Sequence, residues 1–407
     1  MRRFDVAIVG TGHGGAQAAI QLRQLGFVGS IGLIGAEAEP PYERPPLSKD
    51  YLTGEKAFER MLIRPEAFWR EREVSLVPGA RVVEVDAAAR RLVTQGGETF
   101  GYGVLAWAAG GTPRRLRCPG AELAGTHVVR SKADVDAILR ALPAAKRVAV
   151  IGGGYIGLEA AAALRKLGKP VVLVEALDRV LARVAGEPLS RFLAAEHRAR
   201  GVDLRLGASV EALEGERSVE AVRLVGGERI AADLVLVGIG IDPAAAPLLA
   251  AGAAGSDGVD VDAWCRTSLP DVYAVGDCAA HESRWAGGRR VRIESVQNAT
   301  DMATAAARAI AGAPEPYAAM PWFWSNQYDL RLQSVGLPHG HDATLVRGDP
   351  AARAFSLLYL RAGRIVALDA VNATRDYVQV RKLIERGAVL DPARLTDPAV
   401  PLKDLAG

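Results

Sequence analysis

The chain has 407 residues, of which 49% are hydrophobic and 24% are charged, as is typical of a globular protein with a large buried core. The 50 basic and 47 acidic residues leave a formal net charge of +3, which is too balanced to indicate nucleic-acid binding. The most hydrophobic stretch, residues 234–240, is soon interrupted by Asp242 and Pro243, so no membrane span is predicted. A strand is predicted from Phe4 onward, and we therefore expect no secretory signal peptide.

The three cysteines are Cys118, Cys265 and Cys278, and none are spaced as C-x-x-C or C-x4-C pairs. This spacing excludes a zinc ribbon and the redox-active disulfide of flavoprotein disulfide reductases, and we expect no metal site. Unpaired thiols suit a reducing compartment, so a cytoplasmic protein is expected. Cys278 is predicted to be a small buried residue, with a redox thiol as the alternative.

A glycine-rich turn follows the first predicted strand. Residues 4–9 predict a strand, the apolar periodicity of residues 14–25 predicts a helix, and residues 30–34 predict another strand. The turn fits G-x-G-x-x-G, with glycines at Gly10, Gly12 and Gly15. In this pattern the first glycine permits a tight bend, the second admits a pyrophosphate, and the third lets the helix pack on the strand. The helix N-terminus supplies donors for the phosphates.

The same pattern recurs in residues 147–175. A strand is predicted at 147–151, a helix at 155–167 and a strand at 171–174, and the turn glycines are Gly152, Gly154 and Gly157. One such turn is a weak signal, and a purely structural turn is the alternative at each site taken alone. Two turns in context, about 140 residues apart, predict two dinucleotides and electron transfer between them.

Acidic residues near the second turn indicate its nucleotide. Glu175 ends the following strand and is predicted to accept hydrogen bonds from ribose hydroxyls and repel a 2′-phosphate, which favours NADH over NADPH. Arg179 and Arg183 follow nearby, and a pair with a phosphate is the opposing interpretation. Glu159 is predicted to reach the nicotinamide carboxamide. The alternatives are a solvated strand-end carboxylate for Glu175 and a first-turn carboxylate facing the helix dipole for Glu159.

The first glycine turn lacks an acidic residue at the position that corresponds to Glu175 of the second turn. Ala36 occupies the position best placed for a ribose-binding acid, and we expect Glu37 to serve instead. A proline-rich loop then carries Arg44 and Lys49, which suit a pyrophosphate or the edge of a flavin ring.

The rest of the chain predicts the domain organisation. Short strands are expected within 76–112, 222–236 and 259–275, a return linker at 241–247 and an alanine-rich helix at 299–311. After residues 314–316 the composition shifts to an aromatic cluster and arginine-rich strands. We expect an α/β protein with two nucleotide-binding domains, residues 1–112 with 242–316 and residues 113–241, followed by a C-terminal α+β domain of residues 317–407.

Several segments together carry a family resemblance. They are the two glycine turns, Pro41-Tyr42-Glu43-Arg44-Pro45-Pro46-Leu47-Ser48-Lys49, Thr267-Ser268-Leu269-Pro270-Asp271-Val272-Tyr273-Ala274-Val275-Gly276-Asp277 and Pro321-Trp322-Phe323-Trp324-Ser325-Asn326-Gln327. The chain resembles the FAD-dependent NADH:ferredoxin reductases of bacterial oxygenase systems, the family of putidaredoxin reductase and the biphenyl dioxygenase ferredoxin reductase. The resemblance implies glutathione-reductase-like packing of two Rossmann-like domains, with FAD and NADH as cofactors.

The resemblance also implies site residues. Asp277 would bind the FAD ribityl chain, Arg44, Lys49 and Arg114 would contact FAD, and Gln297 and Trp324 would lie near the isoalloxazine. Lys49, Glu159 and Trp324 would position the nicotinamide and the flavin. The other predicted cofactor-binding residues are Gly10, Gly12, Gly15, Glu37, Ala109, Gly110, Gly152, Gly154, Gly157, Glu175, Gly240 and Gly276. Three positions depart from the family pattern on the FAD side: Ala36, Ala109 and Asn326.

The expected reaction is hydride transfer from NADH to flavin N5, followed by single-electron steps to a [2Fe–2S] ferredoxin that serves a Rieske oxygenase or a cytochrome P450. The alternatives are a rubredoxin reductase and an NADH oxidase or peroxidase, although the latter class needs a cysteine before Cys118. An NADH-responsive binding protein like apoptosis-inducing factor is a further alternative.

The expected partner is a ferredoxin, with no nucleic acid or membrane, and the protein is expected to be a monomer or weak homodimer. Four arginines in residues 284–292 predict either a ferredoxin-docking hairpin or a solvated one.

Overall fold

The computed structural model describes residues 1–387 and 389–405 and divides into two compact units. The first unit comprises Met1–Arg44, Phe58–Thr112 and Asp242–Trp322, and the second comprises Pro45–Ala57, Pro113–Ile241 and Phe323–Gly407. The chain leaves the first unit along β7 (Gly111–Pro113) and returns along β16 (Ile241–Pro243), and these two strands pair. Residues 45–57, which include the second half of the proline-rich loop, also belong to the second unit.

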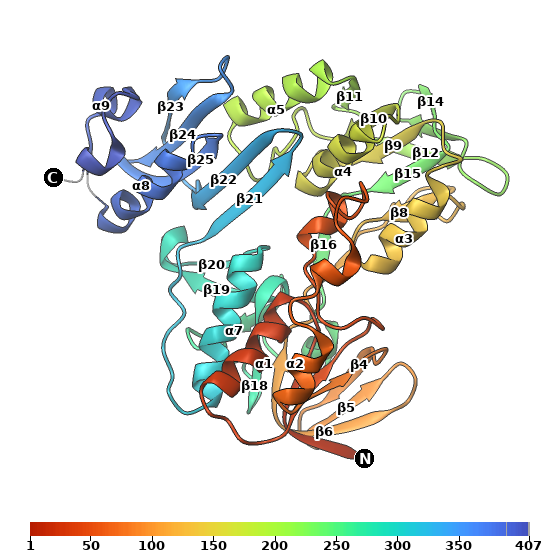
Figure 1. Ribbon diagram of the computed structural model, residues 1–407, viewed down its shortest axis with the longest axis vertical. Coiled ribbons are helices and arrows are strands. Elements are labelled where there is room, and N and C mark those ends of the chain that lie inside the picture. Colours follow the sequence, from red (N-terminus) through yellow and green to blue (C-terminus); the bar gives the residue numbers. More distant parts are fainter. Residues whose placement is uncertain (388, 406–407) are drawn as a thin grey trace. The chain divides into compact units, whose positions relative to one another are not determined.

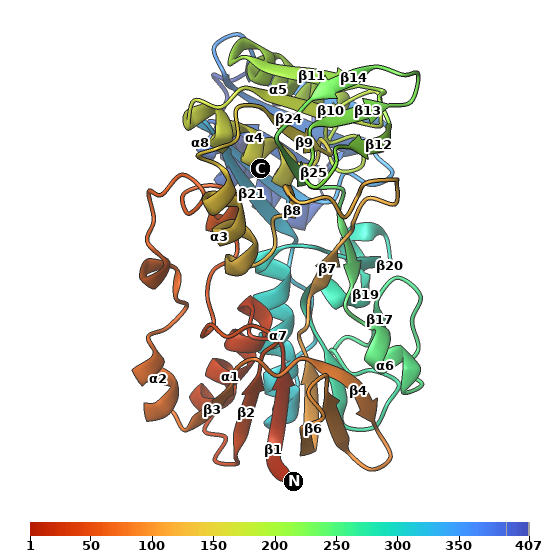
Figure 2. The same cartoon turned by 90° about the vertical axis from the view of Figure 1, so that its right-hand side faces the viewer.

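A seven-stranded sheet forms the core of the first unit, with the order β3-β2-β1-β6-β5-β4 and β18 beside β6. Its strands are β1 (Arg2–Val9), β2 (Ile31–Ile34), β3 (Val74–Val77), β4 (Val82–Asp86), β5 (Arg91–Thr94), β6 (Thr99–Trp107) and β18 (Val272–Ala274). Strands β1, β2, β3, β6 and β18 run parallel, and β1 lies between β2 and β6 (Figure 2). In a sheet with one exposed face, buried and exposed residues alternate along each strand. Strand β2 does not show this alternation: all four of its residues are buried, as expected for a strand covered on both faces.

Two long helices cover this sheet, α1 (His13–Gln24) and α7 (Val296–Ile310), and they pack side by side (Figure 1). Helix α7 begins three residues earlier than the sequence predicts, because the Ser295 side chain accepts a hydrogen bond from the Asn298 N–H and caps the helix. The unit also contains η2 (Phe58–Met61), α2 (Glu66–Glu71), α6 (Ala246–Ala250), β17 (Val259–Val261), η3 (Gly276–Cys278), β19 (Ala279–Ser283), η4 (Arg284–Ala286) and β20 (Arg289–Arg292).

The second unit repeats the arrangement of β1, α1 and β2. Its parallel sheet has the order β11-β10-β9-β15-β8, with β9 between β10 and β15. The elements are η1 (Pro45–Ser48), β8 (Thr126–Val128), α3 (Lys132–Ala141), β9 (Val148–Ile151), α4 (Tyr155–Lys166), β10 (Val171–Glu175), α5 (Glu187–Ala199), β11 (Val202–Leu206) and β15 (Leu234–Val237). A separate small antiparallel sheet consists of β12 (Val210–Glu214), β13 (Ala221–Leu224) and β14 (Arg229–Ala231), and buried residues of this sheet share a hydrophobic cluster with the parallel sheet.

The C-terminal part of the second unit is an antiparallel sheet of order β21-β22-β25-β24-β23 with helices. The elements are β21 (Trp322–Gln327), β22 (Leu330–Gly336), β23 (Ala343–Asp349), β24 (Ala354–Arg361), β25 (Arg364–Val371), α8 (Thr374–Arg386), α9 (Pro392–Thr396) and η5 (Leu402–Leu405). The predicted α/β fold class, with two nucleotide-binding folds and a C-terminal α+β part, is confirmed. Within residues 1–387 and 389–405, no helix is both long and apolar enough to cross a membrane.

Candidate nucleotide-binding sites

The first glycine turn lies at the carboxyl end of β1, between neighbours β2 and β6 on either side. The Gly10 N–H donates to the Ile34 carbonyl at 2.8 Å, and the Ala108 N–H donates to the Val9 carbonyl at 2.7 Å. Gly10 has a φ of +111°, and a Cβ there would lie 2.2 Å from the Ala108 carbonyl oxygen. A Cβ on Gly15 would lie 1.8 Å from the Gly10 carbonyl oxygen. Both positions therefore require glycine for the turn and for helix packing.

The second turn reproduces this geometry. The Gly152 N–H donates to the Val174 carbonyl at 2.8 Å, and the Gly238 N–H donates to the Ile151 carbonyl at 2.7 Å. Gly152 has a φ of +107°, and its Cβ would lie 2.4 Å from the Gly238 carbonyl oxygen. A Cβ on Gly157 would lie 1.9 Å from the Gly152 carbonyl oxygen. The two turns are thus equivalent structures at the carboxyl ends of equivalent parallel strands, β1 in the first unit and β9 in the second.

The middle glycine of each turn differs from its neighbours. A Cβ on Gly12 or on Gly154 would meet no atom within 4 Å, and neither residue has a positive φ. Each is the N-cap of its helix, α1 or α4, and neither helix start is capped by a side chain. Glycine is therefore not needed here for the fold, and the open space beside the first-turn N–H groups fits the pyrophosphate of a dinucleotide.

Glu175 ends β10 and is not the solvated carboxylate that the sequence left open. Its Oε2 accepts the Gly153 N–H at 2.6 Å, and its Oε1 accepts the Leu177 N–H at 2.8 Å. The carboxylate is therefore held beside the second glycine turn. Arg179, considered above as a phosphate partner, donates instead to the Ala182 and Ala185 carbonyls and to the Ser190 hydroxyl. Its role is to hold the 182–185 loop.

Glu159 lies at the centre of a buried polar cluster in the second unit, and its carboxylate is only 3% exposed. Its Oε2 accepts from Lys49 Nζ at 2.7 Å and from Ser48 Oγ at 2.6 Å, and its Oε1 accepts from Ser325 Oγ at 2.7 Å. Lys49 is itself largely buried. Glu159 is beyond the first turn of α4, so the alternative of a carboxylate facing the helix dipole is wrong. Helix α4, η1 with the residue that follows it, and strand β21 build the cluster.

Glu37 and Arg44 lie together in the first unit. Arg44 Nη2 and Glu37 Oε1 form an ion pair at 2.5 Å, and Tyr42 OH donates to Glu37 Oε2. The Arg44 guanidinium also lies 4.7 Å from the centre of the Tyr42 ring. The predicted ribose acid and the predicted phosphate-binding arginine thus form one polar group after β2.

The other predicted cofactor-binding residues divide between the two units. Ala109, Gly110, Gly276, Asp277 and Gln297 belong to the first unit, and Lys49, Arg114, Gly240 and Trp324 belong to the second. The buried Gln297 donates to Asp301 Oδ2 at 2.6 Å and accepts the Trp322 N–H at 3.1 Å. A Cβ on Gly240 would face the guanidinium groups of Arg114 and Arg183. The roles of these residues in cofactor binding stay predictions.

The three cysteines are unpaired, as the sequence predicts. Cys265 and Cys278 are fully buried, and burial raises the pKa of the Cys278 thiol to about 11. Cys278 Sγ donates to the Val275 carbonyl at 3.3 Å. A buried thiol with a raised pKa is unreactive, so the prediction of a structural Cys278 is confirmed. No group of metal-ligating side chains occurs within the described part of the chain.

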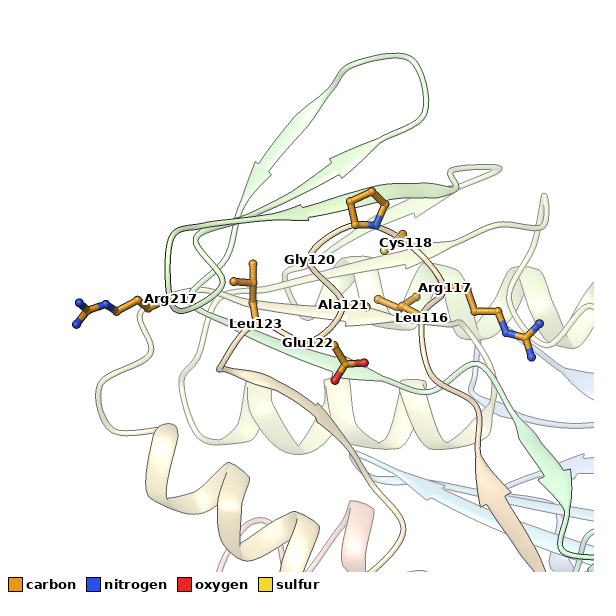
Figure 3. Close-up of a pocket in the computed structure, with 9 residues that line it drawn as sticks. Leu116, Arg117, Cys118, Gly120, Ala121, Glu122, Leu123 and Arg217 are labelled. Carbon is orange, nitrogen blue, oxygen red and sulfur yellow. The ribbon is translucent and has the colours of Figure 1, made fainter.

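The hollow in the second unit that holds Cys118 is not a cofactor site. It has a volume of about 650 Å³ and is lined by residues 116–123 and Arg217. Figure 3 shows Arg117 and Arg217 pointing away from the loop in opposite directions. Polar groups do not converge on it, whereas a ligand site needs a few convergent polar groups.

Ser48, Ser325 and Gln327 are the members of the Glu159 cluster that the sequence analysis did not single out. All three lie in segments that carried the family resemblance: Ser48 is next to Lys49, Ser325 is next to Trp324, and Gln327 is three residues after Trp324. Polar side chains beside a predicted site residue were the available signal, but only the fold shows that they meet Glu159.

Comparisons with known proteins agree with this geometry. The family model described as "Pyridine nucleotide-disulphide oxidoreductase" matches residues 4–303, and the model "Reductase C-terminal" matches residues 322–406. The chain is 60% identical over 407 residues to the 5,5'-dehydrodivanillate O-demethylase ferredoxin reductase subunit of Sphingobium sp., covering 100% of this chain and 99% of the relative. It is 37% identical to putidaredoxin reductase of Pseudomonas putida, covering 98% of this chain and 96% of the relative.

Solved structures give the same result. The ferredoxin reductase for the CYP199A2 system of Rhodopseudomonas palustris matches with a TM-score of 0.95 and 37% identity, covering 99% of this chain and 100% of that one. The reductase in the covalent putidaredoxin reductase–putidaredoxin complex matches with a TM-score of 0.94 and 37% identity, covering 99% and 98%. The chain therefore belongs to the ferredoxin reductases of oxygenase systems, within the pyridine nucleotide-disulphide oxidoreductase family.

Proposed function

We propose that this protein transfers electrons from NADH, through bound FAD, to a [2Fe–2S] ferredoxin that serves an oxygenase. The observation that supports it most is the pair of equivalent glycine turns, each with an open middle position at an uncapped helix N-terminus. The 60% identical relative is the ferredoxin reductase subunit of an O-demethylase, so an oxygenase acting on an aromatic ether is the terminal enzyme to test first.

The first unit fits FAD. Gly10, Gly12 and Gly15 and the N-terminus of α1 would hold the pyrophosphate, and the Glu37–Arg44 group follows β2 where the ribose acid is expected. Gly276 has a φ of +77° and begins η3, which packs against α7. This places the Asp277 backbone near the start of a helix in the same unit, in keeping with its predicted role at the ribityl chain.

The second unit fits NADH. Gly152, Gly154 and Gly157 would hold the pyrophosphate, and the fixed Glu175 carboxylate would meet the ribose and repel a 2′-phosphate. The Lys49–Glu159 pair would orient the nicotinamide carboxamide, because Ser48 and Ser325 fix both carboxylate oxygens.

The chemistry supplied by bound FAD is acceptance of a hydride from NADH and release of the electrons one at a time. The protein contributes orientation of the nicotinamide through Lys49 and Glu159 and selection of the nucleotide through Glu175. The buried Cys265 and Cys278 offer no thiol relay, which favours direct delivery to a one-electron carrier over disulfide or peroxide chemistry. We also propose that the protein is cytoplasmic, that it is a monomer or weak homodimer, and that it has no nucleic-acid or membrane partner.

Stopped-flow spectroscopy of the FAD-loaded protein tests this function. NADH should bleach the flavin absorbance rapidly, and a purified [2Fe–2S] ferredoxin should then be reduced with one electron per cluster. A rubredoxin reductase would prefer rubredoxin over the ferredoxin, and an NADH oxidase would pass electrons to O₂ faster than to either. Either of these results would contradict the proposal, as would a protein that purifies with FMN.

The Glu175→Gln variant should lose discrimination between NADH and NADPH. Removing the charge removes repulsion of a 2′-phosphate, so the ratio of kcat/KM values for NADH and NADPH should narrow by about 1–2 kcal/mol, or roughly 5–30-fold. The ratio cancels any general loss that follows from weaker binding of the Gly153 and Leu177 N–H groups. Glu187→Gln removes an exposed carboxylate from the same unit and should leave the ratio unchanged. An unchanged ratio in both variants would show that Glu175 does not discriminate.

The docking prediction concerns the β19–β20 hairpin, whose Gly287-Gly288 turn is exposed as expected. Arg290 pairs with Asp260 and Glu282, and Arg292 is largely buried and pairs with Asp257 and Glu294. Arg292 also donates to the Asp277 carbonyl at 3.0 Å, which ties the hairpin to the predicted flavin-binding segment. Arg284 and Arg289 are exposed and are therefore the better candidates for steering an acidic ferredoxin.

The Arg284→Glu/Arg289→Glu variant should leave flavin reduction by NADH unchanged and slow ferredoxin reduction at least about tenfold at low salt. The deficit should shrink as salt screens the charges. Arg60→Glu/Arg70→Glu makes the same change in net charge on other exposed residues of the first unit. If both double variants slow ferredoxin reduction equally, the hairpin has no specific docking role.

A further inference from the structure

A continuous chain of hydrogen bonds runs from Glu159 to a histidine on another helix of the second unit. Ser325 Oγ lies 2.7 Å from Glu159 Oε1, and Gln327 Nε2 lies 3.1 Å from Ser325 Oγ. Gln327 Oε1 lies 2.9 Å from His197 Nε2, and His197 Nδ1 lies 3.0 Å from Tyr328 OH. Ser325, Gln327 and His197 are at most 2% exposed, so water does not compete for these bonds.

The chemistry of the groups gives every bond of this chain one direction. Glu159 is an acceptor beside Lys49, so Ser325 donates to it, and Gln327 donates its amide N–H to Ser325. The Gln327 carbonyl oxygen is then left to accept, and His197 must carry its proton on Nε2. His197 Nδ1 is consequently an acceptor for the Tyr328 hydroxyl. All four donors point toward the Glu159 carboxylate, and such chains strengthen one another in a buried environment.

The charges around His197 favour the neutral ring that this chain requires. Burial, together with the nearby Arg200 cation, lowers the pKa of His197. Arg200, at the end of α5, lies with its guanidinium 4.4 Å from the centre of the Tyr328 ring. On the Glu159 side, Lys49 after η1 donates to the carboxylate, and Tyr155 in the first turn of α4 is a titratable group that interacts with it.

The outer end of the chain is anchored at the surface of the same unit. Tyr328 has a φ of +56°, a strained conformation for a residue with a side chain. The next residue, Asp329, accepts a bidentate pair of hydrogen bonds from Arg353 at 2.7 and 2.8 Å and pairs with Arg200 at 2.5 Å. The Arg353 and Arg200 guanidinium groups lower the pKa of Asp329 to about 2. This ion-pair cluster holds the β21–β22 turn, and with it the Tyr328 hydroxyl.

We propose that His197 is a positioning residue for hydride transfer, acting through Gln327 and Ser325 to fix the Glu159 carboxylate and the Lys49 ammonium. The proposal rests on the proposed function, because it needs Glu159 to orient the nicotinamide. Glu159 has two oxygens, and Ser48 with Lys49 fixes only one of them. The chain from His197 fixes the other oxygen and so prevents rotation of the carboxylate.

Stopped-flow flavin reduction over a range of NADH concentrations separates positioning from binding. Ser325→Ala should lower the limiting rate about tenfold, and Gln327→Leu and His197→Leu about three- to tenfold, with the NADH dissociation constant changed less than about twofold. His197→Gln restores a donor at the Nε2 position and should recover the wild-type rate to within about twofold. Ser356→Ala removes another fully buried serine that donates to a carboxylate, Asp376, and should leave the rate unchanged.

Nitrogen NMR of histidine-labelled protein tests the chain without any turnover. The six histidines can be assigned by substitution, and His197 should show the neutral tautomer protonated at Nε2. It should remain so at pH 6, where an unperturbed histidine with a pKa of about 6.5 is largely protonated. Tyr328→Phe, which removes one hydroxyl, should change the Nδ1 signal and lower the limiting rate least.

The outcomes are distinct for the two proposals. A wild-type protein that NADH does not reduce contradicts the proposed function, and the positioning role fails with it. A wild type that NADH reduces, with His197→Leu and Gln327→Leu variants that keep its limiting rate, overturns the positioning role alone. An Nδ1-protonated His197 also overturns it. If His197→Leu does not fold, the limiting rate of Gln327→Leu and the tautomer of His197 in the wild type decide the question.

Discussion

Lys49→Met should destabilise the protein by about 3 kcal/mol and slow flavin reduction by NADH about a hundredfold. The variant leaves the Glu159 carboxylate, only 3% exposed, without its cation and with two hydroxyl donors. A buried charge that loses its partner costs far more than an exposed one. The variant also lacks the Lys49 ammonium, which together with Glu159 is proposed to orient the nicotinamide. Urea unfolding gives the first quantity, and stopped-flow spectroscopy gives the second.

Two controls make this result interpretable. Lys166→Met removes a lysine from an exposed pair with Glu55 in the same unit and should change the free energy of unfolding by less than about 0.5 kcal/mol. Lys49→Met/Glu159→Gln removes both charges and should recover most of the lost stability without recovering the rate. If the double variant is as unstable as the sum of the single variants, the pair is not coupled and this account of the cluster is wrong.

Arg347→Met should release the C-terminal segment and cost about 3–5 kcal/mol. The Arg347 guanidinium is 3% exposed and pairs with Asp376 Oδ2 of α8 at 3.0 Å. It also donates to four carbonyl groups, those of Leu395, Asp397, Pro398 and Val400. A single cation thus binds β23 and α8 to the chain around α9. Without it, the Asp376 carboxylate keeps the Ser356 hydroxyl but loses its cation, and the four carbonyl groups lose the guanidinium donor.

Hydrogen exchange by mass spectrometry locates the damage from this change. Exchange should rise in residues 390–405 and much less in the parallel sheet of β9 and β10. Arg347→Lys keeps the charge but not the planar fork, so it should behave more like Arg347→Met than like the wild type. Arg191→Met, which removes an exposed arginine that pairs with Glu187, should be neutral. Unchanged exchange in residues 390–405 of Arg347→Met would refute the anchoring role.

The elements around the two glycine turns follow from the sequence because their determinants are local. The predicted strands, turns and helices at 4–34 and 147–175 agree with β1, α1, β2, β9, α4 and β10 to within two residues. Apolar periodicity fixes each helix, and Gly10, Gly15, Gly152 and Gly157 are fixed by contacts too short for any side chain. The start of α7 was missed because the Ser295 cap, and not the alanine-rich stretch, decides it.

Tertiary structure decided what each predicted side chain contacts. The sequence allowed Arg179 to bind a phosphate, but the folded loop uses it for the Ala182 and Ala185 carbonyls. It treated Glu37 and Arg44 as separate contacts, whereas the structure pairs them. It named Lys49 and Glu159 together as positioning residues without predicting a contact between them, and the structure joins both residues in one ion pair.

The sequence by itself determined the fold class, the two nucleotide turns and the absence of a cysteine pair. Backbone sterics and residue spacing decide these features, and both act over a few neighbouring residues. The Glu159 cluster, by contrast, needs Ser48 and Ser325, which are 111 and 166 residues away in the chain, and its link to His197 needs a further helix. Hydrogen bonds are directional and extend only about 3 Å, so no pattern in the sequence predicts which distant donors arrive at a carboxylate until the backbone is folded.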